Sequence, residues 1–218
     1  MTGVQTCALP ISSFLCSFTN AGIYDNAMIG NMETVGNAQI STSVVKYGSG
    51  SLYFDGNGDY LVFPADVNNN FAFRTGDFTI EFWAWKPANG TTGYDGVIGA
   101  DNNGNASGGF AVELSSLRGF VFYNDAAVRI SYAMNPNDST WHHYALVRAG
   151  GVMAMYKDGQ QLTTAAYTGD LGASPTLRVG SLGTTANFNG YIDDLRVTKG
   201  VARYTGNFVP PKVAFANQ

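Results

Sequence analysis

The sequence predicts an all-β protein, and three observations support this. Short apolar runs recur along the whole chain, separated by clusters of turn residues. Glycine is abundant, at 27 of 218 residues, and only 13% of the residues are charged, which suits many short strands joined by tight turns. No window keeps a helical period over several turns; the best helical candidate is a single turn at residues 199–204. At this length we expect one domain with a large core.

Turn residues divide the chain into the strands that we expect. The Asp-Gly sequences at 55–58 and 157–159 are the clearest signals, because Asp-Gly supplies the positive φ of a primed hairpin turn. Each is therefore expected to join its two flanking runs in a hairpin. The Asn- and Gly-rich stretches at 66–70 and 101–109 are expected to be loops. The expected strands are residues 14–18, 51–54, 60–63, 78–85, 96–100, 109–114, 118–123, 128–132, 141–149, 152–157, 160–163, 176–180 and 188–198.

The two ends of the chain are expected to lie outside the domain. Residues 1–12 contain apolar side chains but no Lys or Arg, so they lack the charged start of a secretory signal. This segment resembles the translation of a sequencing adapter fused to a metagenomic reading frame; the alternative is a natural, unstructured start. We expect the domain over 13–212 and a tail over 213–218, within a longer parent chain. Cys16 is expected to be a buried hydrophobe rather than a disulfide partner of Cys7.

The charge and hydropathy of the chain exclude two classes of partner. The formal net charge is −4, and the 12 Lys and Arg residues are scattered singly. A nucleic-acid partner requires a concentrated basic patch, so we expect none. No apolar run approaches the ~20 residues that span a bilayer, so we expect no membrane insertion.

Four blocks of the sequence carry a resemblance to a known family. They are GSLYFDG at 50–56, FTIEFW at 78–83, WHHYALVR at 141–148 and FNGYIDDLRVT at 188–198. In this order they resemble the laminin-G-like, concanavalin A-like lectin/glucanase domains that occur in phage and bacterial surface proteins. The resemblance implies a two-sheet antiparallel jelly-roll sandwich, located outside the cell or on a virion surface.

A carboxylate lies among apolar positions in the last of these blocks. If the strand is regular, Tyr191, Asp193, Leu195 and Val197 share one face, because side chains alternate along a strand. A carboxylate on such a face is costly unless it is hydrogen-bonded, paired or bound to a metal. Asp194 then points to the opposite face, so the two adjacent carboxylates are poorly placed to flank one bond unless a bulge intervenes.

The resemblance also implies a structural calcium ion. Calcium takes six to eight oxygens from loops and strands that lie close together. By analogy with the family, its ligands here are Asp193, Asp55 and Asp59. The alternative needs no metal: Asp193 accepts N–H bonds from a neighbouring loop, and Asp55 and Asp59 are turn residues. Both interpretations remain open at this point.

Glycoside hydrolysis is the enzymatic activity to test, because the family includes retaining glucanases. These enzymes need two carboxylates about 5–5.5 Å apart, which strand residues two positions apart can provide. The chain has three glutamates, Glu33, Glu81 and Glu113. Trp83 stands two positions beyond Glu81, and Ser115 stands two positions beyond Glu113. Neither glutamate therefore has a second carboxylate at this spacing. We therefore assign no catalytic residues and expect no enzymatic activity.

The two histidines, His142 and His143, are adjacent and point to opposite faces of a strand. They cannot share a metal ion, and the domain offers no further histidine to complete a zinc site. His143 shares its face with Trp141, Ala145 and Val147. We expect it to be a buried core histidine with its hydrogen bonds satisfied.

One stretch combines the side chains that sugar sites use, a flat ring for the sugar face and amides or carboxylates for the hydroxyls. It lies between positions 94 and 105 and contains the expected ligand-binding residues Tyr94, Asp101, Asn102, Asn103 and Asn105. A smaller group of the same kind is Tyr123, Asn124 and Asp125.

The expected function is that of a non-catalytic recognition module that binds glycans or a surface protein, as part of a phage or bacterial surface protein. The first alternative is a structural or decorative domain of a virion or appendage, without a specific ligand. The second and least favoured alternative is a glycoside hydrolase-like enzyme.

Overall fold

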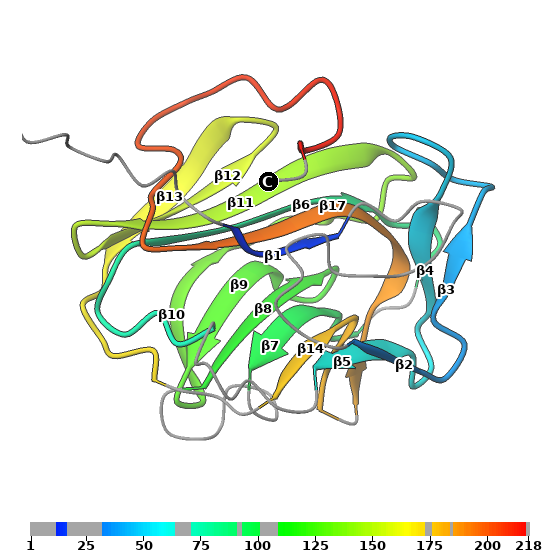
Figure 1. Ribbon diagram of the computed structural model, residues 1–218, viewed down its shortest axis with the longest axis horizontal. Helices are drawn as coiled ribbons and strands as arrows, with labels where there is room; N and C mark the ends of the chain where they lie inside the picture. The colour runs from blue at the N-terminus through cyan, green and yellow to red at the C-terminus, as the bar shows by residue number, and fades with distance from the viewer. Residues whose placement is uncertain are drawn as a thin grey trace, which may run out of the picture.

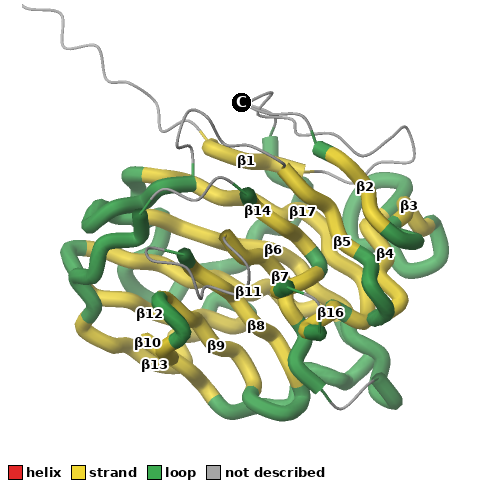
Figure 2. The backbone as a smooth tube through the Cα atoms, turned by 90° about the horizontal axis from the view of Figure 1, so that it is seen from below, coloured by secondary structure: helices red, strands yellow, loops and turns green. Residues whose placement is uncertain are grey.

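The computed structural model describes residues 12–16, 32–63, 71–90, 93–100, 109–172, 176–183 and 185–216, with the side chains of 12–14 excepted. Within these ranges the chain forms strands and turns, and no helix. Two antiparallel sheets lie face to face (Figure 1), and Figure 2 shows that strands make up most of the fold. The predicted all-β, two-sheet jelly-roll sandwich is confirmed. Among the described residues no helix is long and apolar enough to cross a membrane.

Each sheet is assembled from strands that are far apart in the chain. The strands of the larger sheet are β1 (Ser12–Cys16), β3 (Gln39–Ser41), β4 (Ser51–Asp55), β6 (Phe78–Trp85), β11 (Trp141–Ala149), β12 (Val152–Lys157), β13 (Gln160–Ala166) and β17 (Asn189–Lys199). Those of the smaller sheet are β2 (Glu33–Val35), β5 (Tyr60–Phe63), β7 (Gly96–Ala100), β8 (Phe110–Ser115), β9 (Gly119–Asn124), β10 (Ala127–Tyr132) and β14 (Leu177–Val179). A separate hairpin consists of β15 (Ser181–Leu182) and β16 (Ala186–Asn187).

The strand order interleaves early and late parts of the chain. The larger sheet has eight strands in the order β13-β12-β11-β6-β17-β4-β3, and β1 also pairs with β17. The smaller sheet has seven strands in the order β10-β9-β8-β7-β14-β5-β2. In the described part of the chain, neighbouring strands pair antiparallel, as the jelly roll requires.

All the expected strands form, most of them within two residues of the expected ends. The sequence did not predict β2, β3, β15 and β16, which are only two or three residues long. The best helical candidate in the sequence, residues 199–204, is not helical. There the backbone is held instead by the side-chain hydroxyl of Thr79, which donates to Val201 O and accepts from Arg203 N–H.

One of the two predicted hairpins is confirmed and the other is wrong. Lys157 pairs with Gln160 around the turn, where Asp158 has φ 50° and Gly159 has φ 75°, as a primed turn requires. The Asp-Gly sequence at 55–58, in contrast, joins β4 of the larger sheet to β5 of the smaller one. It is a corner of the sandwich, because each flanking strand finds its hydrogen-bond partners in a different sheet.

Strand β17 contains a bulge that overturns the expected side-chain alternation. Asp193 pairs with Trp83 and Arg196 pairs with Glu81, so two residues of β17 oppose a single residue of β6. Asp194 takes up the extra length with a left-handed φ of 46°. The prediction that Tyr191, Asp193, Leu195 and Val197 share one face is therefore wrong. Leu195 and Val197 face the core, together with Ile192; Asp193 and Arg196 face outward.

The bulge lies where β17 changes its neighbour. Residues 189–192 of β17 pair with β4, and residues 195–198 pair with β1. The two short strands therefore lie end to end along one edge of β17, and the bulge fills the junction. Residues 1–11 lie outside the described part, and β1 begins at Ser12, the last residue of the segment expected outside the fold.

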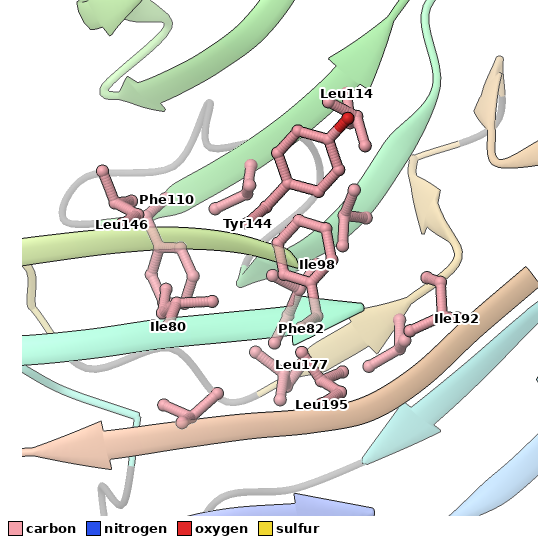
Figure 3. Packing of buried hydrophobic residues seen from close by; sticks show 14 of the residues in the cluster. Ile80, Phe82, Ile98, Phe110, Leu114, Tyr144, Leu146, Leu177, Ile192 and Leu195 are labelled. Atoms are coloured by element: carbon pink, nitrogen blue, oxygen red, sulfur yellow. The ribbon is translucent and has the colours of Figure 1, made fainter. Parts of the chain in front are cut away.

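The core between the sheets consists of apolar side chains from alternate strand positions. Phe82 of β6 and Tyr144 of β11 stack with ring centroids 5.6 Å apart, and burial of each such ring stabilises the fold by about 1.5–3 kcal/mol. The packing gives the outer faces a rigid support. Figure 3 labels Ile80, Phe82, Tyr144, Leu146, Ile192 and Leu195 from the larger sheet and Ile98, Phe110, Leu114 and Leu177 from the smaller one.

Residues 200–216 cross the outer face of the larger sheet, and we call them the C-terminal strap (Figure 1). The N–H of Phe208 donates to Gly159 O at 2.9 Å, and that of Phe215 to Asp194 Oδ2 at 2.8 Å. The Phe208 ring stacks on Tyr204 at 3.5 Å. Phe215 is buried, so the packed chain extends beyond residue 212, where the tail was expected to begin.

Candidate functional site

The candidate site lies on the outer face of the smaller sheet, where β8 and β9 carry polar side chains. Val112 and Leu114 of β8 and Phe122 of β9 belong to the core. Because strand side chains alternate, Glu113 and Tyr123 point to the opposite face. The β15–β16 hairpin folds over part of this face.

The β15–β16 hairpin can lie close against β7 because β7 has glycines at the positions that the hairpin contacts. Leu182 of β15 packs with Ala186 and with Ala111. A Cβ atom at Gly96 would lie 2.3 Å from Cγ of Leu182, and one at Gly99 would lie 2.5 Å from its Cδ2. Only glycine permits such an approach. The hairpin therefore forms a wall beside Glu113 and Tyr123 without a break in β7.

A pocket of about 290 Å³ lies between this wall, the loop before β7 and the turn between β8 and β9. Tyr94 stands at its rim with 43% of its surface exposed, whereas Glu113 is 2% exposed. The pocket thus has an open aromatic rim and a buried carboxylate. Its lining residues are Tyr94, Glu113, Arg118, Tyr123, Ala126, Leu182, Thr185 and Ala186.

A chain of hydrogen bonds fixes the polar side chains of the pocket. Arg118 donates through Nη2 to Tyr94 Oη at 3.1 Å and through Nη1 to Tyr123 Oη. Its guanidinium also lies 4.4 Å from the centre of the Tyr94 ring. Tyr123 then donates to Glu113 Oε2 at 2.7 Å, and the Ser115 hydroxyl donates to Glu113 Oε1. Both carboxylate oxygens are therefore hydrogen-bonded inside the protein, and the guanidinium lies at the exposed rim.

The same contacts shift the pKa values of Tyr123 and Arg118. Burial, followed by the hydrogen bond to Glu113, raises the pKa of Tyr123 to about 12. The hydrogen bond to Tyr123 raises the pKa of Arg118 above its ordinary value. At neutral pH the phenol is neutral and the guanidinium is charged, so the rim offers donors beside an aromatic face.

This arrangement suits a small polyhydroxylated ligand. Arg118 has five N–H groups and uses two of them on the phenols of Tyr94 and Tyr123, so others remain for ligand oxygens. The exposed ring of Tyr94 offers an apolar surface for a sugar face, and the exposed side chain of Thr185 adds a hydroxyl.

The structure brings together two residues that the sequence placed in separate groups. Tyr94 lies in the pocket, and so does Tyr123 from the smaller predicted group, because Arg118 links them. The predicted ligand residues Asp101, Asn102, Asn103 and Asn105 lie outside the described residues. Tyr94 comes two residues before the first residue of β7, and the predicted ligand residues come after its last residue, so β7 separates them in the sequence.

Sequence reasoning missed Arg118, Glu113 and Thr185 as pocket residues. Each comes from a different part of the chain, and none stands near Tyr94 in sequence. The only local signal was the polar alternation of β8, which places Glu113 opposite its core residues. Arg118 and Thr185 carry no local signal, since a charged or hydroxyl residue in a turn is ordinary.

The turn carboxylates Asp55 and Asp59 serve as hydrogen-bond acceptors. Asp59 is buried and accepts the N–H groups of Asn37, at 2.5 Å, and Asp55, at 2.9 Å. Asp55 accepts the N–H of Asn57 in an Asx turn. Asp55 pairs with Asn189 of β17, which leaves Asp193 roughly 13 Å further along that strand.

Asp193 also accepts backbone N–H bonds. Its Oδ2 lies 3.0 Å from Tyr47 N and its Oδ1 lies 2.9 Å from Asp194 N. Among the described residues, no group of three or more His, Cys, Asp or Glu side chains is placed to hold a metal ion. The contacts of Asp193, Asp55 and Asp59 fit the acceptor interpretation, and calcium binding stays a prediction of the resemblance.

We expect Asp193→Ala to destabilise the protein by about 1–3 kcal/mol, because the buried N–H of Asp194 and the partly buried N–H of Tyr47 would lose their acceptor. Urea unfolding measures this effect. A chelator separates the two interpretations: if calcium is bound, EDTA lowers the melting temperature of the wild type and not that of the variant. A variant as stable as the wild type would contradict the acceptor role.

One of the two histidines, His143, lies under the C-terminal strap. His143 is buried as expected, but beneath Tyr204 and Phe208 rather than in the core between the sheets. Its Nε2 lies 3.3 Å from Glu81 Oε2, and among the described residues neither ring nitrogen has a hydrogen-bond partner. The expectation that its hydrogen bonds are satisfied is therefore wrong.

His142 points to the other side of the strand and lies between two carboxylates. Its Nδ1 contacts Asp158 Oδ2 at 2.5 Å and its Nε2 contacts Asp138 Oδ2 at 2.8 Å. The hydrogen bond to Asp158 raises the pKa of His142 above its ordinary value. The two histidines therefore share no site, as their adjacency predicts.

Comparison with known families gives one match. A family model for the concanavalin A-like lectin/glucanases superfamily matches residues 44–202, which is more than half of the chain. A search of the curated proteins found no significant match to this sequence.

Solved structures share the fold at low sequence identity. Domain 4 of AbnA, a GH43 extracellular arabinanase from Geobacillus stearothermophilus solved with arabinotriose, superposes with a TM-score of 0.69 at 16% identity, over 89% of this chain and 95% of that chain. The receptor-binding domain of botulinum neurotoxin C/D mosaic serotype gives 0.67 at 11% identity, over 88% of this chain and 49% of that chain. The binding domain of botulinum neurotoxin DC, solved with rat synaptotagmin II, gives 0.66 at 16% identity, over 88% and 49%. This chain thus spans about half the length of the two toxin domains.

Proposed function

The chain belongs to the concanavalin A-like lectin/glucanase superfamily, and from this premise we propose that it is a non-catalytic module that binds glycans at the Tyr94 pocket. The observation that carries the proposal is the exposed Tyr94 ring, held in place by Arg118 above a pocket whose carboxylate is already engaged. Such a site stacks and hydrogen-bonds a ligand without a free acid or base.

The size of the pocket supports a glycan rather than a protein as the ligand. Its volume of about 290 Å³ is at the lower end for small-molecule sites, which are concave and partly aromatic. Proteins of this fold have been solved with arabinotriose and with synaptotagmin II, so the fold alone allows both classes. A concave site of this volume suits a small ligand rather than a protein surface.

The positions of the carboxylates support a non-catalytic role. Glu81 and Glu113 lie on the outer faces of different sheets, so the core separates them. A retaining glycosidase needs its two carboxylates about 5–5.5 Å apart on one face. Each glutamate is also buried and hydrogen-bonded within the protein. We propose accordingly that the chain hydrolyses no polysaccharide.

The setting that we propose is a bacterial or phage surface protein in which this domain is one module. Binding to a surface glycan would then position the parent protein. A decorative domain without a ligand is the second candidate, and it predicts that no glycan binds.

Tyr94→Ala is expected to weaken glycan binding by ~1–3 kcal/mol, as loss of a large aromatic anchor does. A glycan array, with and without calcium, first identifies a ligand, and calorimetry then measures its affinity. Tyr132→Ala is the matched control, since Tyr132 is an exposed tyrosine at 39% on β10.

Three outcomes would count against the proposal. Unchanged affinity in Tyr94→Ala places the glycan elsewhere on the protein. A blank array favours the decorative role. Release of reducing sugar from any bound polysaccharide overturns the non-catalytic role.

A further inference from the structure

Four aromatic side chains form a line across the outer face of the larger sheet, on the other side of the sandwich from the Tyr94 pocket. They are Tyr53 of β4, Tyr191 of β17, Trp85 of β6 and Trp141 of β11, from four adjacent strands. Each is directly opposite the next in the strand register. Opposed residues of antiparallel strands project to the same side of the sheet. We call this line the aromatic row.

The row faces away from the core. The strand neighbours Leu52, Phe54, Ala84 and Ile192 belong to the core cluster, so the residues beside them in the chain point outward. All four rings of the row remain partly exposed. Among the described residues, no hydrogen bond joins their phenol or indole groups to another side chain or to the backbone.

Hydrogen-bonding side chains border the row. Asp55 and Asn189 form the next cross-strand pair on the same face. On the other side, Lys46 Nζ lies 3.7 Å from the ring centre of Trp83. Gln39, opposite Tyr53 in β3, is exposed at one end. The border therefore carries the ammonium of Lys46, the carboxylate of Asp55 and two amides beside an uncharged aromatic floor. Asp193, which pairs with Trp83, adds a buried carboxylate that interacts with Lys46.

The exposed area argues against a protein partner. A fully buried aromatic side chain covers about 150–250 Å², and each ring of the row is already well over half buried. Together they can contribute roughly 300 Å², against the ~800 Å² that each partner buries in a stable interface. The four side chains of the row carry no charge, so the floor offers no counter-charge to an anionic or cationic ligand.

We propose that the aromatic row is a second glycan-binding site, which takes a single chain of a soluble, neutral polysaccharide lying across the strands. The row spans roughly 14 Å, three strand separations. Its rings are inclined: Tyr53 and Tyr191 lie 5.0 Å apart at 40°, and Trp85 and Tyr191 lie 5.4 Å apart at 81°. Rings turned in this way contact a single twisting chain, whereas a flat crystalline surface requires coplanar rings.

The second site is independent of the Tyr94 pocket, because the two lie on opposite sheets. A module with both sites could hold two segments of one polysaccharide, and its apparent affinity would rise by multivalency. The failure of either site in an experiment therefore leaves the other testable.

Tryptophan fluorescence distinguishes the two sites. The chain has three tryptophans; two belong to the row and Trp83 lies beside it, whereas the lining of the Tyr94 pocket has none. Linear arabinan, laminarin and hydroxyethylcellulose are the probes, with polygalacturonate as the acidic comparison. We expect at least one neutral probe to shift the emission to the blue and to retard the protein in an affinity gel.

The variants Trp85→Ala and Tyr191→Leu are expected to weaken this retardation about tenfold or more. Tyr191→Phe, which keeps the ring, should stay within about twofold of the wild type, and Tyr132→Ala, which changes an exposed tyrosine of β10 outside both sites, should leave the fluorescence response unchanged. The melting temperature of each variant establishes that it is folded, and Tyr191→Leu preserves apolar volume if Trp85→Ala does not fold.

Several results would overturn the proposal. These are no response to any of the neutral probes, equal retardation of Trp85→Ala and the wild type, or a response to polygalacturonate alone. A dimer of the wild type that Trp85→Ala dissociates would also overturn it, because the row would then be a contact between copies of the chain.

Discussion

Glu81→Ala is expected to destabilise the domain by about 3–5 kcal/mol, because it would leave the buried guanidinium of Arg196 without its counter-charge. Glu81 Oε1 accepts from Nε and Nη2 of Arg196 at 2.9 and 2.7 Å, and its Oε2 accepts from Tyr204 Oη at 2.7 Å. Burial alone would raise the pKa of Glu81, but the contacts with His143 and Arg196 lower it. Glu81 is therefore charged in the folded protein.

Urea unfolding at neutral pH measures this loss. The double variant Glu81→Leu with Arg196→Met is the control, since replacing both members of a buried pair with apolar groups is often nearly neutral. It should recover much of the stability lost in Glu81→Ala. An exposed ion pair contributes at most about 1 kcal/mol. If Glu81→Ala lies within about 1 kcal/mol of the wild type, water compensates for the lost carboxylate.

The same substitution should loosen the C-terminal strap. Tyr204 belongs to the strap, and its hydroxyl reaches Glu81 across the sheet surface. Arg203, its neighbour, lies with its Nε 3.8 Å from Glu81 Oε1. Hydrogen exchange of Phe208 N–H, which is bonded to Gly159 O, reports on the strap apart from the rest of the fold.

Strand positions could be predicted from sequence because their causes are local. An apolar run bounded by Asp-Gly or Asn-Gly turns has few alternatives to a strand, and β6, β7 and β11 follow the expected ranges to the residue. The short strands β2 and β3 have no such run. They form because β5 and β4 offer them an edge, which is a tertiary cause.

The arrangement of strands depends on contacts between distant parts of the chain. The bulge at Asp194 exists because β17 passes from β4 to β1, and nothing within the block 188–198 encodes that change of partner. The corner at 55–58 has the same local sequence as a hairpin. Its role is decided by the partners of the flanking strands, which are β17 for β4 and β14 for β5.

The functional surfaces show the same division. Tyr94 could be predicted because an aromatic residue in a polar loop has no core role. The aromatic row could not, since Trp85 and Tyr191 in strands resemble core residues until the register shows which face they occupy. Alternation along a strand shows which residues share a face. When both faces carry aromatic side chains, it does not show which face packs against the other sheet.

Raising the pH from 5 to 8 is expected to destabilise the protein, with Asp194 making the largest contribution. Burial, followed by the nearby charge of Asp193, raises the pKa of Asp194 to about 7. Burial also raises the pKa of Asp193 to about 6. An unfolded aspartate has a pKa near 3.9. Between these values the folded state binds more protons than the unfolded state, so stability falls as the pH rises from about 4 to about 7.

Asp194→Asn tests this assignment. Asn keeps an oxygen for the N–H of Phe215 but cannot ionise, so the variant should be more stable than the wild type at pH 8, on the order of 3 kcal/mol. At pH 4 the difference should vanish, because Asp194 is then protonated in the wild type. Urea unfolding at pH 4, 5, 6.5 and 8 gives both slopes.

The slope that remains in the variant has known sources. Burial raises the pKa of Asp95 to about 6, and the hydrogen bond to Asp158 raises that of His142. A histidine with a raised pKa stabilises the fold below its unfolded pKa, and this stabilisation is lost as the pH rises, so His142 acts in the same direction as the aspartates. The contacts that lower the pKa of Glu81 have the opposite effect on stability, which they reduce as the pH falls. This effect appears only below about pH 4.5. An Asp194→Asn variant with the full slope of the wild type would therefore assign the pH dependence to Asp193, Asp95 and His142, and would contradict the dominant role of Asp194.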